Sequence, residues 1–182
     1  FKKVKKEYYN IYINSKNNVN SVFKKNTLNP SHPTKSKSDI SIVEATLFLL
    51  EKAYHDNPEN QYFVFLCGTC MPLITFNELY TKISHMKYSV IKEFPNNRKD
   101  RYHQLSSKMK SIYKYDKFTK QHPNMILTRN DVEFFIQNKD LIKHFSKMEC
   151  PDEHYFINVM KMLRREYYNH QIMFCNYNTN NT

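Results

Sequence analysis

Apolar side chains in this sequence follow two different periods, which predict strands and helices in alternation. Short runs rich in Tyr, Phe, Val and Ile and bounded by Asn, Pro or Ser have the pattern of strands. These runs cover residues 8–13, 61–66, 88–91, 125–128 and 172–175. The run at 61–66 is an apolar stretch between turn signals, which is typical of a buried central strand.

Four further segments have apolar side chains three or four positions apart, as expected of helices with one buried face. They begin near Ser41, Thr75, Asn130 and Pro151, and we expect the last to run to about residue 168. Ser41 and Thr75 are each followed three positions later by Glu, which is the signature of a capping box.

Strands and helices that alternate along the chain predict an α/β fold, with a mostly parallel sheet flanked by helices. In such sheets, ligands bind outside the carboxyl ends of the strands. Residues 14–16 and 67–72 follow two predicted strands directly, so we expect binding side chains there.

The length of 182 residues fits one domain, residues 1–182, with enough chain to bury a core. The first residue is Phe rather than Met, so we expect an excerpt or a processed chain from a longer protein. The sequence has no run of 18 apolar residues, so we expect no membrane contact within this chain.

The charge balance, 28 Lys and Arg against 17 Asp and Glu, predicts an anionic partner such as nucleic acid, a nucleotide diphosphate or an acidic surface. The basic residues are scattered, however, and the abundance of Lys, Asn, Tyr and Ile is typical of an AT-rich genome. We therefore do not expect nucleic acid to be the partner.

The four cysteines, at 67, 70, 150 and 175, include a single pair with two-residue spacing. A four-thiol zinc site would need a second such pair, so buried free thiols or one structural disulfide are the favoured interpretations. We expect no metal site.

Pro151, Asp152 and Glu153 concentrate acidic chemistry ahead of the last predicted helix. Carboxylates in a first helical turn meet the positive end of the helix dipole, so we expect both to be held ionised. An ionised carboxylate can act as a general base toward a hydroxyl, but acidic residues also cap helices without any catalytic role. The residues alone leave both interpretations open.

Four blocks in order resemble the core-2/I-branching family, which contains β-1,6-N-acetylglucosaminyltransferases and protein xylosyltransferases. The blocks are Ser41–Leu47, Tyr62–Gly68 with Met71-Pro72-Leu73, Arg101-Tyr102 and Pro151–Phe156. The resemblance covers about residues 8–178. It implies a variant of the nucleotide-sugar GT-A fold, with parts of the family fold before Phe1 and after Thr182.

The resemblance also implies an inverting transfer from a UDP-sugar, with GlcNAc expected, to a hydroxyl of a glycan or glycoprotein. Its general base maps onto Glu153. The family's aspartate near the nucleotide falls on Asn14, which with Lys16 becomes the predicted donor contact. The predicted acceptor contacts are Cys67, Gly68, Glu93, Arg98 and Arg101.

The resemblance implies an activity with no metal cofactor, and the sequence contains no Asp-x-Asp motif of the kind that holds a divalent ion on a diphosphate. Arg and Lys would neutralise the diphosphate instead, and the resemblance places them beyond Thr182. The family is usually membrane-anchored in the secretory pathway, and no anchor is present in this chain, so its location stays open. The alternative function is a catalytically inactive carbohydrate- or nucleotide-binding remnant of this fold.

Overall fold

The computed structural model describes residues 4–15, 24–29, 31–35, 38–66, 70–95 and 99–172. The helices are α1 (Ser41–Asp56), α2 (Phe76–Ile83), α3 (Lys99–His103), α4 (Ser107–Ile112), α5 (Arg129–Gln137) and α6 (Tyr155–Met162). The strands are β1 (Tyr62–Phe65), β2 (Ser89–Pro95), β3 (Thr119–Thr128) and β4 (Tyr167–Tyr168). Short 3-10 turns are η1 (Lys6–Tyr8), η2 (Lys24–Asn26), η3 (Tyr115–Lys117), η4 (Lys139–Phe145) and η5 (Pro151–Glu153).

The four strands form one mixed sheet in the order β1-β3-β2-β4. Strand β3 runs antiparallel to both β1 and β2, whereas β2 and β4 are parallel. The α/β class is confirmed, but the expectation of mostly parallel pairings is wrong for the described sheet. The apolar period shows that a strand exists, but it does not show which neighbour the strand will pair with or in which direction. Strand β1, expected to be central, lies at the edge of this sheet.

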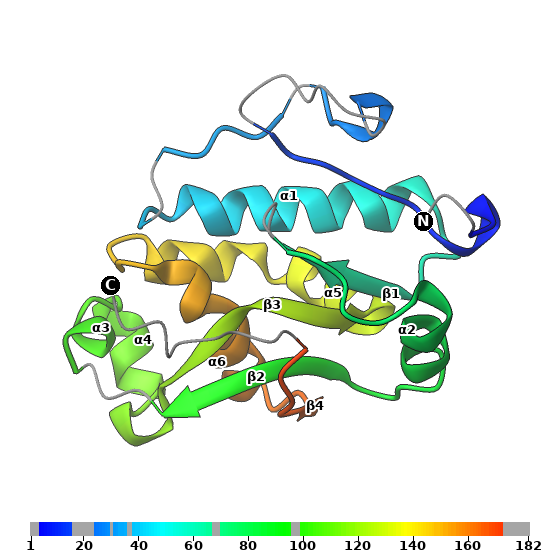
Figure 1. Cartoon of the computed structure of the whole chain (residues 1–182). Helices are drawn as coiled ribbons and strands as arrows, with labels where there is room; N and C mark the ends of the chain where they lie inside the picture. Colours follow the sequence, from blue (N-terminus) through cyan, green and yellow to red (C-terminus); the bar gives the residue numbers. More distant parts are fainter. Residues whose placement is uncertain are drawn as a thin grey trace, which may run out of the picture.

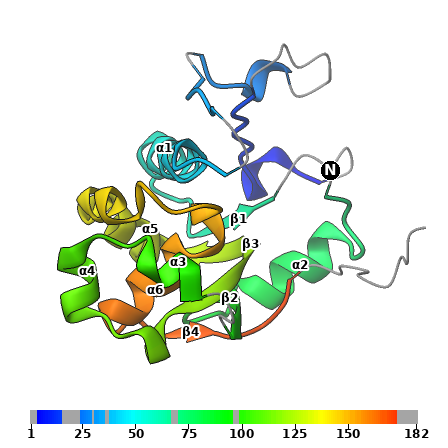
Figure 2. The ribbon, with the colours of Figure 1, turned by 90° about the vertical axis from the view of Figure 1, so that its left-hand side faces the viewer.

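Helices α1, α5 and α6 lie on one face of the sheet, and α2 lies on the other side (Figures 1 and 2). The main core forms between the sheet and these three helices, where apolar side chains are almost fully buried. They include Val43, Leu47, Ile91, Met125, Leu127, Phe135, Tyr155 and Phe156. Helix α2 contributes no buried residue and packs through Phe76 and Tyr80 against Tyr9 and Tyr8.

The helix starts depend on short polar side chains, although not always on the predicted ones. At α2 the predicted capping box is present: Glu78 N donates to Thr75 Oγ1 (3.2 Å), and Thr75 N donates to Glu78 Oε2 (2.7 Å). At α1 the predicted box is wrong, because Ser41 lies inside the helix and its N–H donates to Asp39 Oδ1 (2.9 Å). Helix α5 begins earlier than expected, with Thr128 as its cap.

The predicted strand at 8–13 does not form as a regular strand. The segment contains η1 and a single isolated bridge from Ile13 to Thr27. Its side chains attach it to the end of α1 instead, since Tyr12 donates to Asp56 Oδ2 (2.6 Å). Figure 1 shows this blue segment running alongside α1.

The last predicted helix also ends earlier than expected. Helix α6 stops at Met162, Arg164 takes a left-handed conformation (φ 55°), and the chain then forms β4 beside β2. A positive φ cannot continue a right-handed helix. The predicted strand at 172–175 lies outside the described residues from 173 on.

Candidate active site

The short turn η5 positions the two carboxylates singled out in the sequence. Cys150 enters the turn in a left-handed conformation (φ 51°, ψ 52°), and Pro151 occupies its first position. Two backbone bonds close the turn: Glu153 N donates to Cys150 O (3.1 Å), and His154 N donates to Pro151 O (3.0 Å). The turn is separate from α6, so Glu153 does not lie inside the main helix.

Glu153 forms an ion pair with Lys120, which lies on β3. Lys120 Nζ is 2.8 Å from Glu153 Oε2, and the two side chains are 44% and 30% exposed. The carboxylate is therefore held by a cation and is still reachable from solvent, as a base that must meet a substrate hydroxyl needs to be.

A bulge in β3 shapes the strand beside this pair. Ile91 lies opposite Met125 and Glu93 lies opposite Gln121, so two steps along β2 match four steps along β3. The extra residues fall in the stretch His122-Pro123-Asn124, where Pro123 has no N–H for the ladder. Bulges occur often beside active sites, where they redirect side chains.

His122 belongs to the surroundings of Glu153. Burial lowers the pKa of His122, and the negative charge of Glu153 acts in the opposite direction. The Nδ1 atom of His122 accepts a hydrogen bond from Asn124 N (3.2 Å). A neutral imidazole with an accepting Nδ1 carries its proton on Nε2.

His154 and Asn158 fix η5 against the start of β3. The Nδ1 atom of His154 lies 3.1 Å from Thr119 O, and the His154 ring stacks on Phe118 with centroids 5.1 Å apart. Asn158 Nδ2 donates hydrogen bonds to Thr119 O and to His154 O, each at 2.7 Å. Burial lowers the pKa of His154, so the ring is held neutral. This network sets the separation between Glu153 and Lys120.

Asp152 differs from its neighbour Glu153. Its Oδ1 atom is buried and has no hydrogen-bond partner among the described residues. Burial raises the pKa of Asp152, and the adjacent charge of Glu153 adds to the effect, whereas backbone N–H groups of the turn oppose it. Burial therefore acts against the helix dipole, which was expected to hold Asp152 ionised.

Glu93, a predicted acceptor contact, is bound within the protein. Its carboxylate pairs with Lys161 Nζ on α6 (2.5 Å) and accepts a hydrogen bond from the Tyr167 hydroxyl. Burial alone would raise the pKa of Glu93, but the hydrogen bonds from Lys161 and Tyr167 lower it overall. Contact with an acceptor stays a prediction for this residue.

Arg101, another predicted acceptor contact, lies on α3 and is 9% exposed. Its guanidinium pairs with Glu149 and lies 3.9 Å from Asp100. Its positive charge also lowers the pKa of His154, after the larger effect of burial, so Arg101 is part of the same surroundings as η5. Its contact with substrate stays a prediction too.

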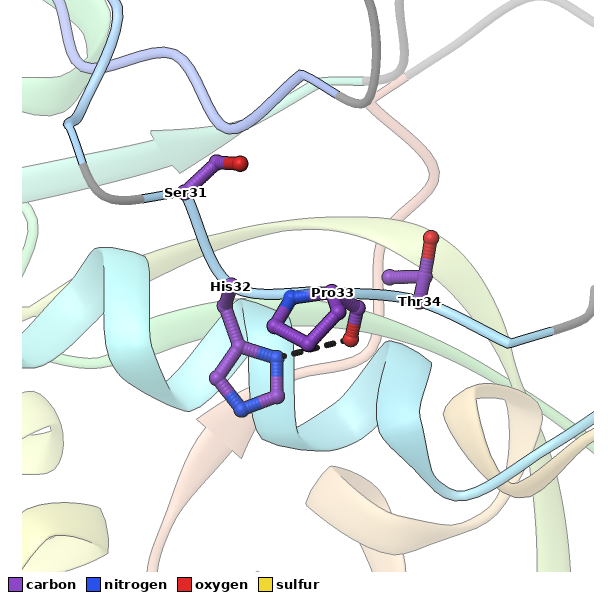
Figure 3. A pocket seen from close by; sticks show the side chains of 4 residues that line it. All are labelled: Ser31, His32, Pro33 and Thr34. Carbon is purple, nitrogen blue, oxygen red and sulfur yellow. Dashed lines mark hydrogen bonds between the residues drawn. The ribbon is translucent and has the colours of Figure 1, made fainter.

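Asn14, the residue predicted to contact the sugar donor, lies near the end of the described N-terminal segment 4–15. Its Nδ2 donates to His32 O (3.0 Å), and its Oδ1 accepts from His32 N (2.7 Å). A pocket of about 280 Å³ is lined by the residues from Ser31 to Thr34. Figure 3 shows His32 in this pocket, with Nδ1 directed at Pro33 O, 3.0 Å away. Within the described residues, no hydrogen bond or ion pair joins Asn14 to the surroundings of Glu153.

The remaining predicted site residues, Lys16, Cys67, Gly68 and Arg98, lie outside the described residues. Nearby, Cys70 Sγ is 3.7 Å from Asn124 Oδ1 on β3. This contact brings the chain that follows 67–69 to the strand that carries Lys120. Cys150 is a free thiol, in line with the free-thiol interpretation for this position.

Sequence reasoning missed Lys120 and His122. The sequence gives no strand signal for them, because residues 119–124 are polar apart from Pro123 and do not alternate with apolar positions. Pro123 adds to the difficulty, since a proline inside a run argues against a strand.

The described part of the chain has neither a metal-binding cluster nor a membrane-spanning helix. No group of three or more His, Cys, Asp or Glu side chains there could hold a metal ion. No helix among the described ranges is both long enough and apolar enough to cross a membrane.

Comparisons with known proteins agree with the resemblance seen in the sequence. The family model described as Core-2/I-Branching enzyme matches residues 1–181. A curated relative, Glycosyltransferase BC10 of Oryza sativa subsp. japonica, is 29% identical over 109 residues, which is 60% of this chain and 26% of the relative. The aligned part thus spans about a quarter of that relative's length. Because the family model matches nearly every residue, the chain belongs to the core-2/I-branching enzyme family.

Proposed function

We propose that this chain carries the base of an inverting glycosyltransferase, which moves a sugar from a UDP-sugar to a hydroxyl of a glycan or glycoprotein. GlcNAc is the expected sugar. The observation that supports this most is a solvent-accessible glutamate, Glu153, held by Lys120 in a chain of this family. The relative BC10, which is named a glycosyltransferase, points to the same class of reaction.

In the proposed reaction the acceptor hydroxyl gives its proton to Glu153. The acceptor oxygen forms a bond to the anomeric carbon, and the bond from that carbon to the diphosphate oxygen breaks. The electron pair leaves with UDP, and attack from the face opposite the diphosphate inverts the configuration. A positioned general base contributes about 10²–10⁴-fold to such a step.

The other site residues keep the roles that the family pattern suggests. Asn14 and Lys16 would contact the donor, whereas the acceptor would meet Cys67, Gly68, Glu93, Arg98 and Arg101. No metal cofactor is part of the proposal, since arginine and lysine side chains can neutralise a diphosphate directly.

The test is sugar transfer by Glu153→Gln, with Glu51→Gln as the matched control. Glu51 also pairs with a lysine, Lys139 (3.3 Å), on a part of the surface away from η5. We expect the first variant to lose at least about 100-fold in rate and the control to keep the rate of the unmodified chain. Full activity in Glu153→Gln would contradict the assignment of the base.

A second candidate is a binding module without activity. One observation favours it: Asn14 lies at the position of the family's donor aspartate, and both its amide nitrogen and its amide oxygen are already hydrogen-bonded to His32. Isothermal titration with UDP and UDP-GlcNAc, with and without EDTA, distinguishes the two when combined with the transfer assay. Binding without transfer would favour the module, and transfer in EDTA would favour the metal-independent enzyme.

A further inference from the structure

We propose that Lys120 is a positioning residue for the base: it holds one oxygen of Glu153, so that the other oxygen faces the acceptor hydroxyl. This inference rests on the proposed function and deepens it. Lys120 is not among the residues that the family pattern marks, and the structure alone points to it.

The first support is the geometry of the ion pair. Lys120 Nζ approaches Oε2 of Glu153 at 2.8 Å, and a lysine is a point charge that binds one oxygen at a time. A carboxylate has two oxygens, and only one of them is needed to accept the acceptor proton. Anchoring Oε2 therefore limits the rotation of the carboxylate and leaves Oε1 to receive the proton.

The second support is that both partners are held by the fold. Lys120 directly follows Thr119 on β3. The carbonyl oxygen of Thr119 is hydrogen-bonded to the side chains of His154 and Asn158, which belong to the segment that carries Glu153. Thr119 N in turn donates to Asn158 Oδ1 (3.0 Å). The pair thus joins two segments that hydrogen bonds between side chains and backbone already fix beside each other, so little conformational freedom is left to lose when the pair forms.

The third support is the electrostatic surroundings. The titratable groups that face the pair are His122 from β3, Asp152 and His154 from η5 and its end, and Arg101 from α3. Burial lowers the pKa of both histidines, so their rings add little positive charge near neutral pH, and burial raises the pKa of Asp152. Among the described residues, Lys120 is the cation in direct contact with the base.

In the proposed reaction the proton moves from the acceptor hydroxyl to the oxygen of Glu153 that Lys120 leaves free. The acceptor O–H bond breaks, its proton moves to Oε1 of Glu153, and the oxygen's electron pair forms the new bond to the anomeric carbon. UDP leaves with the pair of the broken donor bond. Lys120 stays protonated throughout and neither gives nor takes a proton.

The experiment compares kcat and KM of sugar transfer from UDP-GlcNAc in the full 182-residue chain and in Lys120→Met. Without its anchor the carboxylate of Glu153 can rotate away from the acceptor hydroxyl, so we expect kcat to fall by about 10–100-fold while KM for the donor stays unchanged. Lys120→Arg retains a cation beside Glu153, and we expect it to recover most of the lost kcat.

The matched control is Lys139→Met, which breaks the exposed pair with Glu51 and should leave kcat unchanged. An unchanged kcat in a folded Lys120→Met would overturn the role of Lys120 and leave the proposed function standing. No transfer by the unmodified chain would instead overturn the proposed function, and the role of Lys120 with it. An equal loss of kcat in Lys139→Met would also overturn the role of Lys120, because the effect would then be one of general charge.

Discussion

The molecule contains two glutamate–lysine pairs that join the sheet to the segment around α6, and they differ in burial. Glu93 and Lys161 are 19% and 22% exposed, and Tyr167 and Thr119 bind to the same two side chains. Glu153 and Lys120 are 30% and 44% exposed, and within the described part of the chain the Glu153 carboxylate has no further hydrogen-bond or ion-pair partner. The same chemistry therefore supplies a structural tie in one place and, in the proposed function, an accessible base in the other.

The two pairs should also differ in the free energy of unfolding that is lost when one partner is removed. A buried charge left alone costs about 3–5 kcal/mol, whereas an exposed pair contributes about 0–1 kcal/mol. An accessible pair can thus be used for chemistry at little cost to stability.

Glu153→Gln should show the contrast most clearly when it is compared with Glu93→Gln. We expect the first to lose at least about 100-fold in transfer rate and keep its melting temperature. The second should lose about 2 kcal/mol of unfolding free energy, because Lys161 stays half-buried without its carboxylate. Transfer assays and urea unfolding on both variants provide the check, and the reverse assignment of effects would break the comparison.

The Glu93 pair should also make stability depend on pH. The pKa of Glu93 is lowered in the folded chain, so its contribution is present above the unfolded value of about 4.3 and is lost as the pH falls through the folded one. We expect the stability gap between the unmodified chain and Glu93→Gln to shrink below about pH 4. A gap that is constant from pH 3 to pH 7 would contradict the ionic role.

Asp152→Asn should act in the opposite direction. The pKa of Asp152 is raised, so its contribution is most favourable below about pH 4 and is lost as the pH rises through the folded value. Because its Oδ1 is buried without a partner, we expect the variant to be more stable at pH 7 by about 1 kcal/mol. Urea unfolding at pH 4 and pH 7 measures the change. A loss of stability at pH 7 would contradict this prediction, because it would show that the Asp152 carboxylate stabilises the folded chain.

Tyr167→Phe should produce the smallest effect. It removes the hydroxyl that donates to Glu93 but leaves the Lys161 pair in place, so we expect a loss of about 1 kcal/mol. Transfer activity should be unchanged. Thermal unfolding compared with Tyr168→Phe, an exposed neighbour on the same strand, gives the matched control.

The sequence predicted those parts of the fold that depend on local patterns. The apolar period located α1 and β1, and the Thr75–Glu78 box located α2, because both signals act within a few residues. It did not predict that β3 lies between β1 and β2, since the pairing depends on contacts between distant segments. The end of α6 was missed for the same reason, because Arg165 binds Asp131 on α5 and draws the chain into β4.

Of the candidate site, the sequence provided Glu153 but not its surroundings. The Pro-Asp-Glu block is contiguous and carries the family resemblance, so it could be recognised by eye. Lys120 reaches Glu153 across 33 positions of the chain, and such a contact between distant segments has no local signal in the sequence. Burial of Asp152 was equally invisible, because the sequence does not show which side of a short turn will face the core.

The bulge in β3 also divides one strand into halves of different rigidity. Residues 125–128 pair with β1, and Met125 and Ile126 pair with β2 as well, whereas 119–121 pair with β2 alone. Amide hydrogens in the first half should exchange with solvent far more slowly than those around His122. One strand therefore combines a half that is paired on both sides with a half that is paired on one side and is held on the other by side chains of the segment that carries Glu153.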